Sequence, residues 1–338
     1  MRLQDFWYVV AESDELAREG VLARQVLDEW LVLFRGPEGR PVCLRDRCMH
    51  RAARLSRGTC SKGQLRCDYH GWTYAADGSV VAVPSEGERF KALENRKAVV
   101  YDCVEQDGYV YVRLGDDCGV EPFSMRHHGE AGWHTVRVQN RFANNVTNCV
   151  ENFIDIPHTV FVHPGIFRKQ RQQALDATIR REGLAVHVDY RGETDNLGWF
   201  RRFLNPDGHA IEHTDSFHAP NVTHVVYRFG PRRTFLITSQ SVPVSDMETL
   251  VYTDLTYDYG LWNRLAAPIV RYQGQKVIEQ DVEALSLQGE VIEKYGDRFA
   301  NTPADTIHVF VESIRNALAD GRDPRDLPEK SVEVSFWV

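Results

Sequence analysis

The segment CMHRAARLSRGTCSKGQLRCDYHGW (48–72) carries four metal-ligating side chains in two short pairs. The first pair is Cys48-x-His50, and the second, after 16 intervening residues, is Cys67-x-x-His70. Two thiolates and two imidazoles in this arrangement suit a four-ligand site built by two neighbouring loops. A set of ordinary buried residues is the weaker interpretation at this density, and the segment predicts a metal centre.

Two kinds of centre fit these ligands. Zinc accepts two Cys and two His in a tetrahedral structural site. A Rieske [2Fe–2S] cluster needs the same set, with two Cys on one iron and two His on the other, and the neutral imidazoles raise its reduction potential. Cys43 and Cys60 lie outside the pairs, and we expect both to be structural thiols.

The chain around this segment has 338 residues, of which 43% are hydrophobic and 26% are charged. This composition supports a sizeable core in two domains or one large one, and it excludes a disordered or fibrous chain. The net charge of −8 argues against a broad nucleic-acid-binding surface. Seven cysteines are an odd and sparse number, so we expect no disulfide framework.

The N-terminus, MRLQDFWYVVAESDEL, has acidic residues where a signal peptide needs an apolar core. No run of the sequence approaches the roughly 20 apolar residues that span a bilayer. We therefore expect a cytoplasmic protein that does not associate with a membrane.

In the first part of the chain, apolar and polar residues alternate over short runs that are separated by turn residues, which predicts a small β domain. Strands are expected at 21–27, 31–35, 99–102 and 109–114, with a Gly/Pro hairpin connection at 36–41 and a polar loop at 85–97. The segment GDDCGVEP (115–122) mixes acidic and turn residues, as expected at the end of a domain.

The second part of the chain mixes strands with long helices. Helical spacing at 144–164 follows a strand at 135–138, strand-like runs lie at 184–190, 199–204, 224–229, 234–242 and 249–257, and helices are expected at 274–288 and 305–319. Strands followed by long helices packed across them predict an α+β sheet domain.

The pattern C-x-H-R…C-x-Y-H-G-W resembles the Rieske motif of the Rieske non-haem iron oxygenases. The matching residues are Cys48, His50, Arg51, Cys67, Tyr69, His70, Gly71 and Trp72. The chain departs from the motif at Met49 and Ala52, where many members have Pro and Gly, but neither position is a ligand. The resemblance implies a [2Fe–2S] cluster on the two pairs, shielded by Tyr69 and Trp72.

A second motif follows at Glu151-Asn152-Phe153-x-Asp155-x-x-His158-x4-His163. Ferrous iron in oxygenases is held by two His and one carboxylate, which leaves positions open for O2 and substrate. His158 and His163 lie about 140° apart around a regular helix. Both reach one metal only where the helix distorts or ends, and Pro164 supplies an ending. Helix capping or a satisfied core pair is the alternative for these histidines.

The third iron ligand is expected in QKVIEQDVEAL (275–285), where Ile278, Val282 and Leu285 form an apolar stripe at helical spacing. Asp281 lies on this inward face, whereas Glu279 and Glu283 point away from it. A carboxylate on a buried face is costly unless it is paired or binds a metal. The family has its carboxylate ligand in a similar E-x-D helix, which favours Asp281, and an internal salt bridge is the alternative.

The resemblance assigns Asp155 a bridging role. The matching residue of the family hydrogen-bonds a Rieske histidine of the neighbouring subunit and carries electrons between the two metal sites. This implies a homotrimer arranged head to tail, in which Asp155 meets His70 of another chain; a surface Asp without a partner is the alternative. Motif matching also places four residues in the substrate pocket, with core packing as their alternative: Asn152, Phe153, Thr159 and Val277.

The sequence has no G-x-G-x-x-G after a strand and therefore no flavin or nicotinamide fingerprint. We expect electrons from a separate flavin/iron–sulfur reductase or a ferredoxin, with NAD(P)H used only indirectly. Residues 45–66, here called the basic collar, have a balance of +6, which leaves −14 for the rest of the chain. Its cations are Arg45, Arg47, Arg51, Arg54, Arg57, Lys62 and Arg66. Such a collar predicts docking of an acidic electron donor; contact with a neighbouring subunit and plain solvation are the alternatives.

These observations predict an α+β protein, and the resemblance implies an all-β Rieske [2Fe–2S] domain at 1–118 and a helix-grip (START-like) catalytic domain at 119–338. The resemblance implies an oxygenase component that uses O2, mononuclear Fe(II) and donor electrons to hydroxylate or oxidatively demethylate an aromatic or cyclic small molecule. The short chain resembles the monooxygenase branch. Two alternatives stay open: a cis-dihydroxylating arene dioxygenase, and a zinc-stabilised ligand-binding protein without turnover.

Overall fold

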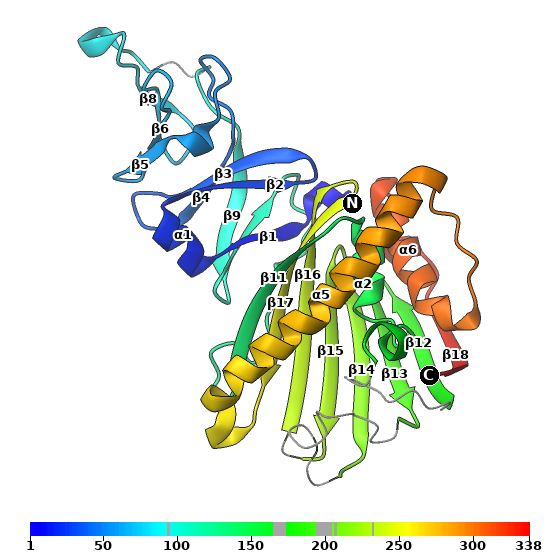
Figure 1. The fold of residues 1–338 in the computed structure, drawn as a ribbon. Helices are drawn as coiled ribbons and strands as arrows, with labels where there is room; N and C mark the ends of the chain where they lie inside the picture. The colour runs from blue at the N-terminus through cyan, green and yellow to red at the C-terminus, as the bar shows by residue number, and fades with distance from the viewer. Residues whose placement is uncertain (93–94, 165–173, 194–204, 206–207, 232) are drawn as a thin grey trace. The chain divides into compact units, whose positions relative to one another are not determined.

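A computed structural model describes residues 1–92, 95–164, 174–193, 205, 208–231 and 233–338 (Figure 1). The chain divides into two compact units. One unit comprises Gln4–Ser124, and the other comprises Met1–Leu3 together with Met125–Val338. The domain boundary expected between residues 118 and 119 falls in the last turn-rich stretch of the first unit.

The first unit consists of two antiparallel sheets. A six-stranded sheet has the order β1-β10-β9-β4-β3-β2, and a four-stranded sheet has the order β5-β6-β7-β8. The strands are β1 (Trp7–Glu12), β2 (Val21–Val26), β3 (Glu29–Arg35), β4 (Pro41–Arg45), β5 (Thr59–Ser61), β6 (Gln64–Arg66), β7 (Thr73–Tyr74), β8 (Val80–Ala82), β9 (Val100–Gln106) and β10 (Tyr109–Arg113), and helix α1 spans Ser13–Glu19. The four predicted strands of this region are confirmed as β2, β3, β9 and β10.

The core of the first unit supports the two Cys–His loops. Four consecutive apolar residues of β3, Leu31–Phe34, are fully buried. Val32 and Phe34 belong to the same apolar cluster as Cys48 and Cys67. The loops between β4 and β8 are therefore anchored on the face of the larger sheet.

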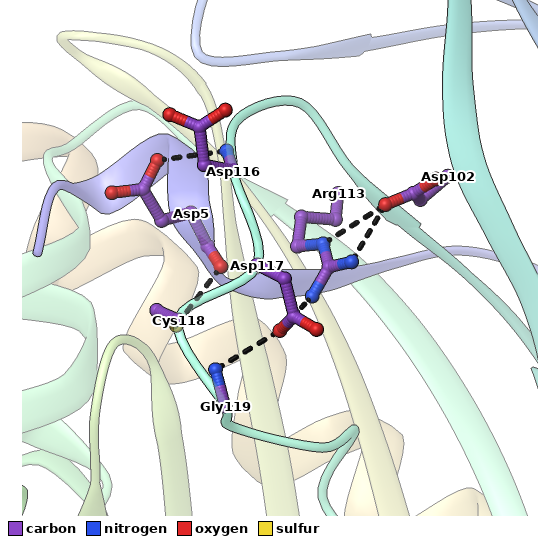
Figure 2. Close-up of polar contacts among 7 residues, drawn as sticks. All are labelled: Asp5, Asp102, Arg113, Asp116, Asp117, Cys118 and Gly119. Atoms are coloured by element: carbon purple, nitrogen blue, oxygen red, sulfur yellow. Dashed lines mark hydrogen bonds and ion pairs between the residues drawn. The ribbon is translucent and has the colours of Figure 1, made fainter.

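The end of the first unit is fixed by a small polar cluster (Figure 2). The guanidinium of Arg113, at the end of β10, contacts Asp102 at 2.6 Å and also pairs with Asp117. The thiol of Cys118 donates to the backbone carbonyl of Asp5 at 3.1 Å. These contacts hold the acidic turn that follows β10 against the start of the chain. All seven cysteines are free thiols in this structure.

The second unit is built on one eight-stranded antiparallel sheet with the order β11-β17-β16-β15-β14-β13-β12-β18. Its strands are β11 (His134–Phe142), β12 (Ala174–Glu182), β13 (Ala185–Arg191), β14 (Ile211–His218), β15 (Val222–Phe229), β16 (Arg233–Ser245), β17 (Glu248–Tyr257) and β18 (Lys330–Trp337). Its helices are α2 (Val146–Asn152), α3 (Thr159–Val162), α5 (Asn263–Tyr295) and α6 (Thr306–Ala319). The short 3-10 turns of the whole chain, in both units, are η1 (Leu3–Asp5), η2 (Leu55–Arg57), η3 (Gly87–Arg89), η4 (Gly260–Trp262), η5 (Pro303–Asp305) and η6 (Pro324–Asp326).

Helix α5 lies across the strands of this sheet (Figure 1). Its inward side chains Ile278 and Leu285 pack in one apolar cluster with Val138 and Val251 of the sheet. The helix predicted at 274–288 is only the middle of this 33-residue helix. Among the described helices, none has the length and apolar character needed to cross a membrane.

The second unit differs in part from the elements predicted for it. The single helix predicted at 144–164 is wrong, because the chain forms α2, a turn and the one-turn helix α3. The chain does not end in a helix, since β18 returns to pair with β12 at the sheet edge. The strand expected at 199–204 lies outside the described residues.

Candidate metal centres and the adjoining cavity

The two Cys–His loops have the same backbone design. The amide of Ala52 donates to the carbonyl of Cys48 at 3.0 Å, and the amide of Gly71 donates to that of Cys67 at 2.9 Å. Ala52 and Gly71 both have a positive φ, of 56° and 74°. Such a φ is costly for a residue with a Cβ, which explains why Gly is the common residue at the position of Ala52. Each loop thus turns its Cys and its His toward the same side.

The four predicted cluster ligands lie together. The rings of His50 and His70 have centroids 4.5 Å apart, and Cys48 and Cys67 are almost fully buried. Trp72 stacks on His50 with centroids 4.8 Å apart. The structure therefore brings the two pairs predicted from the sequence to one place, with an aromatic cover on one side.

The donor atoms at this site fit a Rieske cluster. Nδ1 of His50 is buried and has no hydrogen-bond partner in the described part of the chain. Burial and the adjacent Cys48 thiol raise the pKa of Cys67, so two thiolates at this spacing need a compensating cation. The hydroxyl of Tyr74 lies 3.1 Å from the Cys48 sulfur and accepts from the Met49 amide at 2.8 Å. A cluster with two Cys and two His ligands satisfies these requirements.

The second site is formed at the two ends of α3. His158 is the N-cap residue of this helix and His163 is its C-cap residue. The predicted change of direction between the two histidines is therefore achieved by a single helical turn. Helix α2 ends at Asn152 and α3 begins at Thr159, and Pro157 in the connection prevents a continuous helix because proline removes a backbone donor and clashes with the preceding turn. The expected ending at Pro164 follows directly after His163.

Asp281 on α5 faces both histidines. Its Oδ1 lies 3.0 Å from Nε2 of His163 and 3.6 Å from Nε2 of His158. Nevertheless, within the described structure this buried oxygen has no well-formed hydrogen bond. One ligand atom from each of the three residues lies within 4.8 Å of the others. Two imidazoles and one carboxylate converging in this way match the donor set of a mononuclear non-haem iron site.

The second ring nitrogen of each histidine is held by a side-chain acceptor. Nδ1 of His158 lies 3.1 Å from Asp155 Oδ2, which also accepts the His158 amide at 3.1 Å. Nδ1 of His163 lies 2.9 Å from Gln280 Oε1. These contacts turn both Nε2 atoms toward Asp281. Partners of this kind fix the ring orientation of metal-ligating histidines.

The charges of the histidines and carboxylates at this site affect one another's pKa values. Burial lowers the pKa of His158, but the neighbouring carboxylates of Asp155 and Asp281 outweigh it and raise the pKa to about 9. Burial raises the pKa of Asp281, yet the two facing imidazoles hold the pKa below its ordinary value. A buried carboxylate facing two imidazoles is thus stabilised only by positive charge, which a divalent cation would supply.

An apolar cavity of about 160 Å³ lies beside this site. His158, His163 and Asp281 all contribute to its lining. The four residues that motif matching placed in the pocket, Asn152, Phe153, Thr159 and Val277, line it as well. Most of the remaining wall comes from one face of the sheet and from α5, with further residues from the α2–α3 connection, which is why strand periodicity alone could not assign it.

Sequence reasoning missed a charged group in the cavity wall. The ring of His213, on β14, lies between two carboxylates: Nδ1 is 2.8 Å from Glu193 Oε2 and Nε2 is 2.9 Å from Asp215 Oδ1. The strand IEHTDSFH (211–218) mixes polar and apolar residues and was not predicted. The two-residue spacing of His213, Asp215 and Phe217 could have indicated the buried face of a strand, since all three side chains are buried.

The basic collar is partly neutralised within its own unit. Arg45 pairs with Glu29 and Arg54 pairs with Asp46. The other five cations are exposed, and none has an ion pair among the residues described: Arg47, Arg51, Arg57, Lys62 and Arg66. The exposed ring of Tyr69 lies beside that of His70, with centroids 3.9 Å apart. This face therefore combines free positive charge with the imidazole of a candidate cluster ligand.

Two protein families match the sequence. The Rieske [2Fe-2S] domain matches residues 6–105, and the vanillate O-demethylase oxygenase C-terminal domain matches residues 142–321. The first covers both Cys–His pairs, and the second covers the three residues that converge on the candidate iron site.

Curated relatives share about a third of the matched residues. The vanillate O-demethylase oxygenase subunit of Pseudomonas sp. is 32% identical over 53% of this chain and 50% of the relative. The methylxanthine N1-demethylase NdmA of Pseudomonas putida is 35% identical over 48% of each chain. The putative toluene-4-sulfonate monooxygenase iron-sulfur subunit TsaM2 of Comamonas testosteroni is 30% identical over 61% of this chain and 57% of the relative. The matched segment thus spans about half the length of these relatives.

Solved structures share the fold over nearly the whole chain. Dicamba monooxygenase bound to 3,6-dichlorosalicylic acid has a TM-score of 0.82 with 21% identity, covering 94% of this chain and 98% of the other. NdmA of Pseudomonas putida with caffeine has a TM-score of 0.78 with 22% identity, covering 96% and 94%. The predicted fold, an N-terminal Rieske domain followed by an antiparallel sheet with helices across it, is confirmed.

Proposed function

Because the chain belongs to the Rieske oxygenases that have a vanillate O-demethylase-type C-terminal domain, we propose that it is the oxygenase component of a multicomponent system. In this proposal it uses O2 and electrons from a separate donor to hydroxylate or oxidatively demethylate an aromatic or cyclic small molecule. Relatives described as vanillate and methylxanthine demethylases support the reaction class.

One observation carries the proposal. The apolar cavity is lined by the same three side chains that form the candidate iron site, His158, His163 and Asp281. A small molecule held in this cavity is next to the metal ligands and is surrounded by apolar side chains. Such a cavity holds a largely apolar substrate and limits the entry of water to the reacting atoms.

The proposed cofactors follow from the donor sets. Cys48, His50, Cys67 and His70 would hold the [2Fe–2S] cluster, and His158, His163 and Asp281 would hold the mononuclear Fe(II). When bound, the cluster supplies one-electron transfer and the ferrous iron supplies O2 activation with open coordination positions. The protein's own part is to keep the imidazole rings oriented, through Asp155 and Gln280, and to shield the cavity with apolar residues of the sheet and α5.

The proposed electron supply is external. The sequence has no nucleotide-binding fingerprint, so NAD(P)H would act only through a flavin/iron–sulfur reductase or a ferredoxin. Asp155 contacts His158 at 3.1 Å, which supports half of the proposed bridge; its other half would be His70 of a neighbouring chain in a homotrimer. An iron–sulfur protein of this kind is suited to the reducing cytoplasm.

The proposal is tested with protein purified without oxygen. A Rieske EPR spectrum, stoichiometric iron, and substrate-dependent O2 uptake with a surrogate reductase are the expected results. Mass analysis of products with labelled O2 separates one incorporated atom, or loss of a methylene unit, from the two label atoms of a cis-diol. A colourless protein containing zinc would overturn the proposal in favour of a ligand-binding protein.

The bridging role of Asp155 gives a first prediction. In protein loaded with saturating Fe(II), Asp155→Ala is expected to retain the cluster but to slow electron transfer from cluster to iron by at least about 100-fold, since it removes the side chain next to His158. Rapid-mixing reoxidation of the reduced cluster in one turnover measures this rate. Glu283→Ala on the exposed side of α5 is the control. An Asp155→Ala protein with both metals and wild-type turnover would contradict the role.

A further inference from the structure

The start of α5 exposes a row of large apolar side chains. Four of them have exposed fractions between 43% and 68%: Trp262, Leu265, Ile269 and Tyr272. Their spacings of three, four and three residues place them on one flank of the helix. A single exposed apolar residue is common on a protein surface, but a neighbouring group of this kind marks an interaction site.

The charged residues at the start of α5 are all cations. Residues 259–278 contain Arg264, Arg271 and Lys276 but no aspartate or glutamate. All three cations are exposed, and none forms an ion pair with an acidic side chain in the described part of the chain. Arg271 donates to the backbone carbonyl of Arg137 at 2.9 Å, which leaves its charge in place. Positive charge is thus concentrated here in a chain whose net charge is −8.

The apolar and the charged side chains together are here called the α5 patch. Its members are Trp262, Arg264, Leu265, Ile269, Arg271, Tyr272 and Lys276.

The α5 patch continues into the wall of the cavity. Ile269 is 43% exposed and also lines the cavity, so it lies at the cavity rim. Ala266, Val270 and Gln273 line the cavity as well. In Figure 1, this end of α5 lies away from α6. A partner that covers the α5 patch therefore also meets the rim of the cavity.

The composition of the α5 patch fits an anionic lipid surface. Tryptophan and tyrosine favour the boundary between headgroups and acyl chains, where an apolar ring and a polar group are both satisfied. Leucine and isoleucine are buried in the apolar layer, while arginine and lysine extend to anionic headgroups. A second copy of this chain fits less well, because a twofold contact would place the same cations against one another.

We propose that the α5 patch docks this protein on an anionic lipid surface, with Trp262, Leu265 and Tyr272 in the headgroup region and the cavity rim facing the lipid. Such docking departs from the sequence-based expectation of no membrane association, which considered spanning segments only. A helix that binds a lipid surface lies parallel to it and needs no spanning length. The docking goes beyond the proposed oxygenase function and does not depend on it.

The test uses the holoprotein and two kinds of unilamellar vesicle. One kind is phosphatidylcholine alone, and the other is phosphatidylcholine mixed with an equal amount of phosphatidylglycerol. Flotation gives the partition coefficient, which at low salt is expected to be at least about tenfold higher for the anionic vesicles. The difference should shrink as salt rises, because salt screens exposed charges. No binding to the anionic vesicles, or binding no stronger than to the neutral ones, overturns the proposal.

Apolar variants locate the contact. Trp262→Ser combined with Leu265→Ser is expected to reduce partitioning onto anionic vesicles at least about tenfold, because it removes the two most exposed apolar side chains of the α5 patch. Leu287→Ser combined with Val291→Ser is the matched control, since these side chains are 58% and 56% exposed toward the other end of the same helix. An equal loss in the two double variants overturns the assignment to the α5 patch.

Charge variants test the preference for anionic lipid. Arg264→Gln combined with Lys276→Gln is expected to lower the ratio of anionic to neutral partitioning at least about fivefold. Lys294→Gln combined with Arg298→Gln removes two exposed cations outside the α5 patch and should leave the ratio unchanged. A loss as large in this control as in the first variant overturns the charge role of the α5 patch.

Sedimentation velocity without lipid tests whether the α5 patch instead binds a second copy of this chain. The wild type and the protein with both Trp262→Ser and Leu265→Ser are expected to have the same oligomeric state. A smaller assembly in the variant would assign the α5 patch to a subunit contact and overturn the lipid docking.

The outcome is separable from that of the proposed function. The same preparations are assayed for the Rieske EPR spectrum and for iron content. Protein that has the cluster and iron but does not prefer anionic vesicles refutes only the docking. Protein that binds these vesicles but lacks the cluster refutes only the proposed oxygenase. Retained cluster and iron also show that the variants have folded.

Discussion

At the scale of single residues, Gln280 is the least conspicuous part of the candidate iron site. It lies between exposed Glu279 and buried Asp281 on α5, and its amide oxygen is 2.9 Å from Nδ1 of His163. An acceptor at this position keeps the Nδ1 proton in place and leaves Nε2 free to bind a metal. Its role is to position a ligand.

Gln280→Leu is therefore expected to lower Fe(II) affinity by about 10- to 100-fold without loss of the [2Fe–2S] cluster. Titration of the iron-depleted protein with Fe(II), followed by calorimetry or a competing chelator, measures the affinity. Gln275→Leu makes the same change on the same helix, where the amide donates to Glu279, and should leave the affinity unchanged. Equal affinities of the two variants would contradict the positioning role.

His213 gives a prediction for pH. Its pKa rises from the ordinary 6.5 to about 9 in the folded protein. A raised pKa means that the folded state binds the proton more tightly, so the stabilisation is complete below the ordinary pKa and is lost as pH rises through the raised one. The free energy of unfolding should fall by up to about 3 kcal/mol between about pH 7 and pH 10.

Urea unfolding of the protein, followed by far-ultraviolet circular dichroism at a series of pH values, checks this dependence. His213→Gln is expected to be less stable at neutral pH and to lose most of the alkaline slope. A variant whose stability falls with pH as steeply as the wild type would assign the slope to other groups.

The residue scale also shows what spacing can and cannot predict. Cys48, His50, Cys67 and His70 could be found because each pair lies within one short loop. Asp281 could be found because a carboxylate interrupts an apolar stripe. The Glu193–His213–Asp215 group could not, since its members come from a loop and a strand whose partnership depends on strand pairing.

At the scale of elements, two glycines determine how closely α5 approaches the sheet. A Cβ on Gly289 would lie 2.1 Å from the backbone oxygen of Ala143, and one on Gly274 would lie 2.4 Å from Cδ1 of Leu255. The first contact is with backbone that cannot move independently. The second is with the end of a side chain that can change rotamer, and Gly274 also lines the cavity.

Gly289→Ala is expected to destabilise the catalytic unit by about 1–3 kcal/mol or more, because the helix must move away from the sheet. Gly274→Ala should cost less stability and should instead weaken ligand binding by narrowing the cavity. Thermal unfolding and the affinity for a small aromatic ligand, measured on both variants, distinguish these effects. A larger loss of stability in Gly274→Ala than in Gly289→Ala would contradict this explanation.

Strands and helices whose apolar residues follow one clear period could be predicted, whereas elements in which a proline or a turn interrupts this period could not. The strands β2, β3, β15, β16 and β17 were predicted from alternation or apolar runs. The helix expected across 144–164 was wrong because Pro157 ends the helical spacing and Asp155 accepts the following His158 amide, which starts a new turn. Helix α5 extends beyond its predicted bounds at both ends, where its residues are mostly exposed and amphipathic spacing gives no signal.

At the scale of the whole molecule, charge is divided unevenly. The basic collar has +6, and the rest of the chain has −14. Two of its seven cations are neutralised by Glu29 and Asp46, and the others surround the candidate cluster loops. We expect this face to accelerate docking of an acidic electron donor, as steering fields do in other complexes.

Arg57→Glu combined with Lys62→Glu is therefore expected to reduce the association rate of an acidic ferredoxin by at least about tenfold at low salt. The wild-type rate should fall as ionic strength rises, and stopped-flow reduction of the cluster measures both effects. Lys91→Glu, a charge reversal at an exposed site outside the collar, is the control. Wild-type kinetics that do not depend on salt would contradict the docking role.

The division of the chain into a β domain and an α+β domain could be predicted, because composition and periodicity change near residue 120. The return of β18 could not, since KSVEVSFW (330–337) is short and follows a long helical region. Its partner β12 is distant in sequence, and such pairing depends on the completed sheet.

The position of β18 has a consequence for synthesis. Among the described residues, strand β12 obtains its outer neighbour from residues 330–337, which are synthesised long after β12 itself. Throughout translation of the intervening chain, the catalytic sheet exposes an unpaired edge to other nascent chains. A ribosome that stalls before residue 330 therefore holds a domain that has its candidate iron ligands but can still pair through β12 with another polypeptide.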